Sequence, residues 1–149
     1  MYAIDLRTNE PRSAHELLGG VKLLARVIDK GRAAICGTLG RYLFFDCPLD
    51  RVFFDALKIS RNGFLEILQR AYTSHLCSNA IALADLREAV ECEPEISDGY
   101  FLVWAETSDA DNAAVIWLLD QTNTSRGVLD AINAAVDRLP PETFIDWSY

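Results

Sequence analysis

A chain of 149 residues, half of them hydrophobic, is long enough to bury one core and too short for several domains. Its net charge of −8 argues against a nucleic-acid partner, because an acidic protein repels phosphate backbones. The sequence holds no apolar run of about 18 residues, and no apolar stretch of the kind a signal peptide needs follows Met1. We therefore expect a cytoplasmic protein that makes no contact with membranes.

The first predicted helix is short. It begins at Ser13, because Ser13 and Glu16 have the spacing of a capping box, and the pair Gly19-Gly20 should end it. His15 would lie in its first turn, where an exposed helix residue is the favoured interpretation and a general base the lesser one.

The second predicted helix, over about residues 21–35, is the feature around which the rest of the chain is interpreted. Leu23, Leu24, Val27 and Ile28 recur at helical spacing and form one apolar stripe. Charged residues crowd the other positions of this helix, and those three or four apart share a face. These charged residues are Arg26, Asp29, Lys30 and Arg32.

Three elements follow in the first half. Residues 37–46 are predicted to form a loop or a small β-hairpin, with glycine at Gly37 and Gly40. A helix over about 48–57 should begin at Pro48, since proline is favoured at the first helical position. Another should run from its cap at Ser60 to about residue 71.

The second half contains further helical signals. They predict helices over about 79–91 and 109–120, an acidic linker at 91–95, and a last helix from its cap at Ser125 to about 139. Residues 100–104 could be a helix or a buried strand, and we favour the helix. The aromatic tail 144–149 should dock on the core or on a partner. The predicted fold is therefore all-α, a compact bundle of six to eight short helices.

Side chains that could bind a substrate or take part in catalysis are concentrated between residues 18 and 50. Cations on the second helix could bind an anion, nearby carboxylates could move a proton, and a cysteine beside a helix N-terminus could be a thiolate of lowered pKa. The candidates are Arg26, Lys30, Arg32 and Tyr42 for substrate binding, and Asp29, Asp50 and Cys47 for catalysis. The alternative is an ion-paired helix face with a cysteine that is simply a small buried hydrophobic residue.

Metal and cofactor motifs are missing from the sequence. The four cysteines, at positions 36, 47, 77 and 92, form no Cys-x-x-Cys pair, and the chain has two histidines. We therefore predict no bound metal and reduced thiols. The sequence also lacks a P-loop and a Gly-x-Gly-x-x-Gly fingerprint, so no cofactor is predicted.

The same stretch resembles a known family. The residues that carry the resemblance are Asp5-Leu6, Pro11-Arg12-Ser13, Leu18-Gly19-Gly20, Ala25 to Lys30, Arg32-Ala33, Gly37, Gly40, Tyr42 and Cys47-Pro48-Leu49-Asp50. In this order they are similar to a bacterial family catalogued as a domain of unknown function, number 5069, over about residues 4–66, with a looser similarity after 97. Where the family usually has Glu before the tyrosine, this chain has Arg41, which removes one candidate acid and adds positive charge. The resemblance implies a small, mostly helical cytoplasmic domain and brings no established activity.

The resemblance and the helix pattern together suggest a single domain over residues 1–149, with an insertion atypical of the family at about 67–96. Charge divides this domain unevenly. Residues 1–75 carry 11 Lys and Arg against 8 Asp and Glu, whereas residues 76–149 carry 3 against 14. The basic half could host a small anionic molecule. Alternatively, the acidic half packs against the basic half, within one chain or across a homodimer.

Two functions follow from these patterns. The first is a small-molecule-binding domain, either non-catalytic or an enzyme that performs cofactor-independent acid–base chemistry on a small anionic substrate, as isomerases, lyases and cyclases do. This function requires Arg26, Asp29, Lys30 and Asp50 to converge on one concave pocket. The second is a non-catalytic interaction module that uses the acidic, aromatic C-terminal half. It expects the same charged residues to form surface or structural ion pairs, and Trp147 and Tyr149 to lie in an exposed patch.

Overall fold

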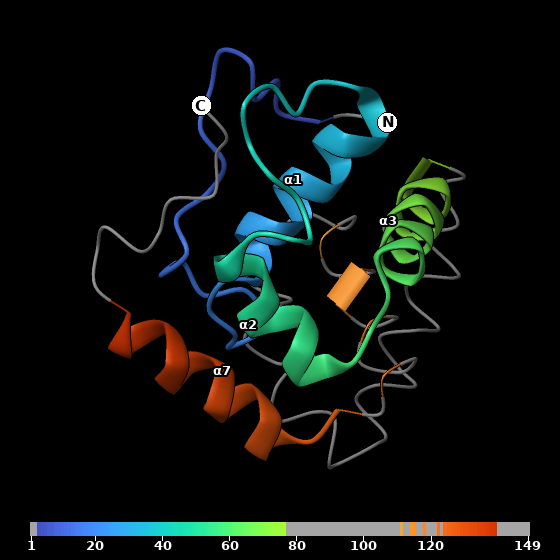
Figure 1. The fold of residues 1–149 in the computed structure, drawn as a ribbon. Coiled ribbons are helices and arrows are strands. Elements are labelled where there is room, and N and C mark those ends of the chain that lie inside the picture. Colours follow the sequence, from blue (N-terminus) through green and yellow to red (C-terminus); the bar gives the residue numbers. More distant parts are fainter. Residues whose placement is uncertain are drawn as a thin grey trace.

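The computed structural model describes residues 3–76, residues 111, 114, 115, 118 and 122, and residues 124–139. The described part is helical and contains four helices and no strand. The helices are α1 (Leu24–Cys36), α2 (Pro48–Leu57), α3 (Arg61–Leu76) and α7 (Arg126–Arg138), shown in Figure 1. The predicted all-α class therefore holds for this part of the chain.

Helix α1 lies at the centre of the described structure, where it packs against α3 while α2 packs against α7 (Figure 1). Its apolar stripe is buried, with Val27 and Ile28 at most 1% exposed. Gly31 allows the close approach of α3, because a Cβ at this position would lie 2.5 Å from Cδ1 of Leu68. Phe53, Phe54 and Phe64 fill the core between the helices in edge-to-face contacts with ring centroids 5.1–6.1 Å apart.

The segment before α1 differs from the prediction. Residues 13–16 form a turn instead of a helix, since Glu16 N donates to Ser13 O at 3.1 Å and the Ser13 hydroxyl accepts from His15 N at 3.2 Å. Helix α1 begins at Leu24 and not near residue 21. Leu23 adopts a left-handed conformation with φ of 72°, and its N–H donates to Ala14 O at 2.8 Å. Pairing with the preceding segment thus replaces the first turn of the predicted helix.

Residues 37–46 form an irregular loop, and the predicted hairpin is not seen in them. The start of this loop is tied to the N-terminal segment by the hydrogen bond from Leu6 N to Thr38 O, at 3.0 Å. Gly40 has a φ of 63°, and a Cβ there would lie 2.9 Å from the Leu6 carbonyl oxygen, so glycine is required at this position.

The predicted starts of the three other helices are confirmed. Pro48 is the first residue of α2, and the Ser60 hydroxyl accepts from Gly63 N at 3.0 Å at the start of α3. Helix α3 continues to Leu76, five residues beyond the predicted end. Ser125 precedes α7, which ends at Arg138, where Leu139 is its C-cap.

Asp111, Ala114, Val115, Leu118 and Thr122 are helical, which agrees with the helix predicted over 109–120. The first four are buried and recur at helical spacing, so they present one face to the core. The elements predicted at 79–91, 91–95, 100–104 and 144–149 lie outside the described residues, and the total of six to eight helices stays a prediction. Within the described ranges, no helix is long and apolar enough to cross a membrane.

Candidate functional site

Lys30 and Asp50 form a buried ion pair between α1 and α2. Both side chains are fully buried, and Lys30 Nζ donates to Asp50 Oδ1 at 2.5 Å and to Leu43 O at 3.0 Å. Asp50 Oδ2 accepts from Phe45 N at 2.9 Å. Burial raises the pKa of Asp50 above 3.8, because loss of hydration outweighs the attraction of Lys30. The pair therefore holds the 43–50 segment on α1, and the two charged groups themselves lie away from solvent.

Cys47 lies beside this pair and is the N-cap of α2, where its Sγ accepts from Asp50 N at 3.3 Å. Lys30 Nζ is 3.7 Å from the same sulfur. Burial, followed by the nearby negative charge of Asp50, raises the pKa of the Cys47 thiol to about 11. The predicted lowered pKa is therefore wrong: Cys47 does lie at a helix N-terminus, but desolvation outweighs the helix dipole and Lys30.

A second charge network lies on another side of α1. The Arg12 guanidinium donates two hydrogen bonds to Asp29, from Nη2 to Oδ1 at 2.9 Å and from Nε to Oδ2 at 3.0 Å. The Arg12 backbone N–H also donates to Asp29 Oδ2, at 2.9 Å. Asp111 joins the network because its Oδ2 accepts from Arg12 Nη1 at 3.0 Å and its Oδ1 forms an ion pair with Arg32 Nη1 at 2.7 Å. These four side chains are buried or half-buried. Their arrangement fixes the N-terminal segment and residue 111 to α1.

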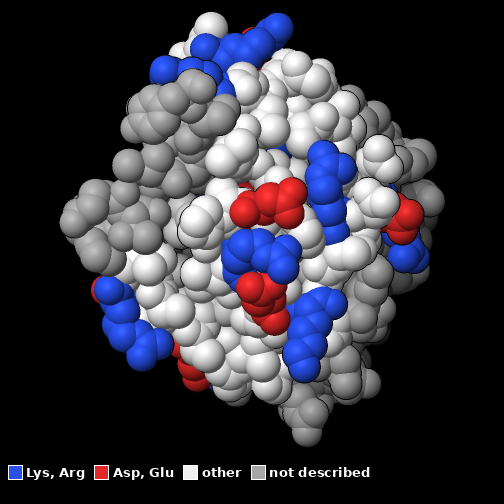
Figure 2. Space-filling model, viewed as in Figure 1, with Lys and Arg blue, Asp and Glu red and all other residues white. Residues whose placement is uncertain are grey.

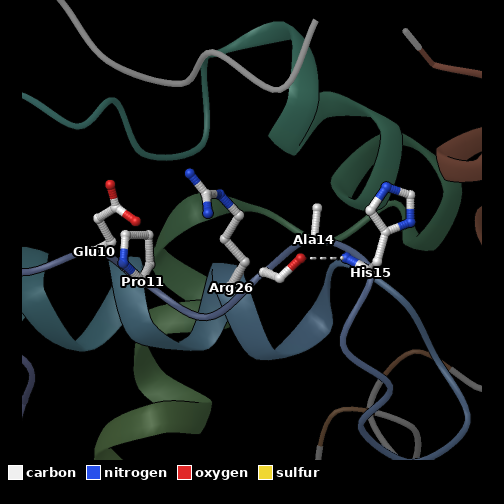
Figure 3. A pocket seen from close by; sticks show the side chains of 6 residues that line it. Glu10, Pro11, Ala14, His15 and Arg26 are labelled. Atoms are coloured by element: carbon white, nitrogen blue, oxygen red, sulfur yellow. Dashed lines mark hydrogen bonds between the residues drawn. The ribbon is translucent and has the colours of Figure 1, made fainter. Parts of the chain in front are cut away.

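Arg26 is the candidate that borders an open pocket. The pocket, of about 310 Å³, is lined by Glu10, Pro11, Ser13, Ala14, His15 and Arg26. Helix α1 supplies Arg26, and the segment that crosses this helix supplies the other lining residues (Figure 3). Arg26 Nη1 donates to Arg12 O at 3.2 Å, and the guanidinium lies 5.7 Å from the centroid of the Tyr42 ring. Two contacts from different segments thus orient this guanidinium.

The polar side chains of the pocket extend to the same side of the crossing segment. In Figure 3, Glu10, Arg26 and His15 follow one another along this side. His15 Nδ1 also lies 3.9 Å from Asp137 of α7, and Lys22 pairs with the same carboxylate. Glu10 is exposed and, among the described residues, has no ion-pair partner. The pocket therefore combines a fixed cation with an unpaired carboxylate.

The structure separates the predicted site residues into three places. Lys30 and Asp50 form the buried pair with Cys47 beside it, and Asp29 and Arg32 lie in the second network. Arg26 lines the pocket, and Tyr42 contacts Arg26 without being a lining residue. Arg12 and Asp111, which complete the network, and Glu10 and Ser13, which line the pocket, were not selected from the sequence. Arg12 and Asp111 are 99 residues apart, so no local pattern connects them.

The described His, Cys, Asp and Glu side chains are poorly arranged for binding a metal ion. Among the described residues, no three His, Cys, Asp or Glu side chains lie close enough together to hold one. The carboxylates of Asp29, Asp50 and Asp111 are engaged by Lys or Arg. On the face shown in Figure 2, acidic and basic side chains lie next to one another and form no extended patch of one sign.

These features define a small helical domain with a central helix, a buried Lys–Asp pair and a polar pocket at one side. The chain belongs to the family described as a domain of unknown function, DUF5069, which it matches over residues 8–93, more than half of its length. The match includes the pocket and the Lys30–Asp50 pair but ends before Asp111 and α7. No curated protein matches the chain.

Proposed function

We propose that this protein binds a small anionic molecule in the pocket beside Arg26. The observation that carries the proposal is a guanidinium held in place by the Arg12 carbonyl and the Tyr42 ring at the border of an open pocket. An arginine oriented before binding loses less side-chain entropy when it engages a carboxylate or phosphate, and its planar fork can do so with two hydrogen bonds.

The other lining groups suit a ligand of modest size. Ser13 offers a hydroxyl and His15 an imidazole, while Pro11 and Ala14 offer apolar surface. A volume of about 310 Å³ lies at the lower end of the range that small-molecule sites occupy. The ligand would therefore be a compact metabolite rather than a large cofactor.

A catalytic version of this proposal places the acid–base role on His15. Asp29 and Asp50 each form ion pairs with buried or half-buried cations, so a proton transfer from either would disrupt the fold as well as the site. His15 borders the pocket and is exposed, and imidazole is the side chain that most often transfers protons near neutral pH. Isomerisation, elimination or cyclisation of the bound anion would be the reaction class.

The interaction-module alternative uses the acidic, aromatic C-terminal half to bind another protein or a second copy. Trp147 and Tyr149, on which it depends, lie outside the described residues. Two of the described acids of this half form ion pairs within the chain, Asp111 with Arg12 and Arg32, and Asp137 with Lys22, whereas Asp130 is exposed. Part of its negative charge is thus neutralised within the chain, whereas the ion pairs of Asp29, Lys30 and Asp50 are those that this alternative expects.

Substitution of Arg26 tests the proposed function. Purified protein would be titrated with inorganic phosphate and with a panel of small mono- and dicarboxylates while the amide signals of residues 10–15 and 26 are followed by NMR. Arg26→Gln should weaken binding by about tenfold or more, since it removes a charged hydrogen-bond donor. Arg51→Gln is the matched control, because Arg51 pairs with Asp55 and stacks on Phe45. Equal affinity in the wild type and Arg26→Gln would overturn the proposal.

A further inference from the structure

We infer that Lys30 and Cys47 are the site of an oxidative cross-link, in which the side-chain nitrogen of Lys30 captures the sulfur of Cys47 after hydrogen peroxide has oxidised that sulfur. The inference concerns the buried contact between α1 and the start of α2, and it does not depend on the pocket beside Arg26. It assigns a modification to two side chains that the proposed function leaves without a role.

The observation behind it is a contact between an amine and a thiol that neighbouring groups hold in place. Lys30 Nζ lies 3.7 Å from Cys47 Sγ, and both side chains are buried. Asp50 Oδ1 and Leu43 O fix the position of the nitrogen, and Asp50 N donates to the sulfur at 3.3 Å. The fold therefore keeps this nitrogen next to this sulfur.

The cross-link forms in two steps. First, the thiol of Cys47 attacks hydrogen peroxide, so that an S–O bond forms while the O–O bond breaks, and the products are a sulfenic acid and one water. Second, the amine of Lys30 attacks the sulfenic sulfur, an S–N bond forms, and the hydroxyl group leaves with one amine proton as a second water. Sulfenic acids condense with nitrogen to sulfenamides in this way. The sulfur loses two electrons overall, and the peroxide gains them.

Asp50 is the base that the second step requires. Its carboxylate lies 2.5 Å from Lys30 Nζ, so it can accept the proton whose loss turns the ammonium group into a nucleophilic amine. Burial raises the pKa of Asp50, because desolvation disfavours the carboxylate. The proton transfer thus replaces two buried charges with two neutral groups, and the cross-link leaves a neutral carboxylic acid beside an uncharged nitrogen.

Burial also selects the fate of the oxidised sulfur. The raised pKa of the Cys47 thiol makes the first step slow, as it does for alkylation. A sulfenic acid formed at this position is shielded from thiols in solution, whereas the Lys30 nitrogen is already in contact with it. A reaction partner held at the reacting atom has a high effective concentration. The exposed Cys36 at the end of α1 should instead be oxidised further or form mixed disulfides.

Oxidation of the wild-type protein with hydrogen peroxide tests the inference. After the remaining thiols are blocked, the protein is digested with trypsin without reductant, and its peptides are identified by mass spectrometry. Trypsin does not cleave after a modified Lys30, so the cross-link should join peptide 27–32 to peptide 42–51, with a mass two hydrogens below their sum. A thiol reductant should release both peptides, because a thiolate that attacks the sulfur displaces the amine.

Three controls locate the cross-link. Oxidation in urea should give at least about tenfold less of it, because unfolding separates the nitrogen from the sulfur. Cys47→Ser should give none and should keep the fold, since serine is a favoured N-cap residue at the start of α2. Cys36→Ser removes an exposed sulfur instead and should give as much cross-link as the wild type.

The inference is overturned if oxidised Cys47 is recovered as a sulfinic or sulfonic acid while trypsin still cleaves after Lys30. Equal amounts of cross-link in buffer and in urea would also overturn it, because the folded contact would then have no part in the reaction. The third contrary result is a Cys47 that stays reduced under conditions that oxidise all of Cys36, since peroxide would then not reach the buried pair.

Discussion

Lys30 and Arg26 are one helical turn apart on α1, and the environments of the two cations are opposite. Lys30 is fully buried and held by Asp50, Leu43 O and the sulfur of Cys47. Arg26 borders an open pocket that the exposed Glu10 also lines. A cation whose partners are all supplied by the chain stabilises the fold. A cation at the border of an open pocket is placed where a small ligand could reach it.

Because of these environments, removing the charge of Lys30 should lower the free energy of unfolding more than removing the charge of Arg26. Removing one member of a buried ion pair leaves a charge without water or a partner, which is far more costly than removing an exposed charge. At the pocket, water solvates whatever charge remains. The comparison can therefore be tested by substitutions whose effects on the free energy of unfolding should rank by burial.

Lys30→Met should have the largest effect. It leaves Asp50 buried without its cation and should lower the free energy of unfolding by about 3–5 kcal/mol, measured by urea denaturation. The double variant Lys30→Met/Asp50→Leu should recover part of this loss, because it also removes the buried carboxylate. A loss below about 1 kcal/mol in the single variant would show that the pair contributes little.

The pH dependence of the Lys30→Met variant sharpens this test. The pKa of Asp50 is already raised above 3.8 in the folded protein, so the folded state holds this proton more tightly than the unfolded state does. The associated stability is present below pH 3.8 and is lost as pH rises through the folded pKa. Loss of Lys30 should enlarge this dependence, and Lys30→Met/Asp50→Asn should lack it.

Cys47 should react slowly with alkylating reagents in the folded protein. A pKa raised from 9.0 to about 11 lowers the thiolate fraction at pH 8 by about a hundredfold, and burial slows the reaction further. Iodoacetamide labelling, read by peptide mass spectrometry in buffer and in urea, measures this protection. Labelling of Cys47 in buffer as fast as in urea would restore the thiolate interpretation.

Asp111→Asn should have an intermediate effect. It weakens the ion pairs with Arg12 and Arg32 and should lower the free energy of unfolding by about 1–3 kcal/mol. Asp55→Asn is the matched control, since the exposed Arg51–Asp55 pair should contribute about 0.5 kcal/mol or less. Equal effects of the two substitutions would mean that burial does not set the strength of these pairs.

Elements with strong local signals were predictable from the sequence. Pro48 and the serines at 60 and 125 mark helix starts through their own backbone preferences or hydrogen bonds, and α2, α3 and α7 begin where these residues predict. The capping-box pattern at Ser13 failed because its signal is overridden by distant contacts. Arg12 N bonds to Asp29, and Leu23 N to Ala14 O, so this segment crosses α1 in an irregular conformation.

The site was less predictable than the fold. Helical spacing correctly gathered the charges on α1, but spacing does not tell which face meets the core, a partner or solvent. The cluster of cations on this helix predicts Lys30 as a substrate ligand, but Lys30 is buried, which is rare for a lysine, and its partner Asp50 is 20 residues away. Glu10 carries no motif, and only the path of its segment across α1 brings it to the pocket.

Glu10→Gln should have the smallest effect on stability. Glu10 is exposed and has no ion pair within the described residues, so the free energy of unfolding should change by less than about 0.5 kcal/mol. Arg26→Gln should cost more, about 1 kcal/mol, because it loses the contacts with Arg12 O and Tyr42. Both are measured by urea denaturation beside Lys30→Met. If Glu10→Gln instead destabilised the protein as much as Asp111→Asn, the carboxylate would be part of the fold. The contrast between the charges that hold α1 in the core and the charges that line the pocket would then disappear, because both sets would stabilise the same structure.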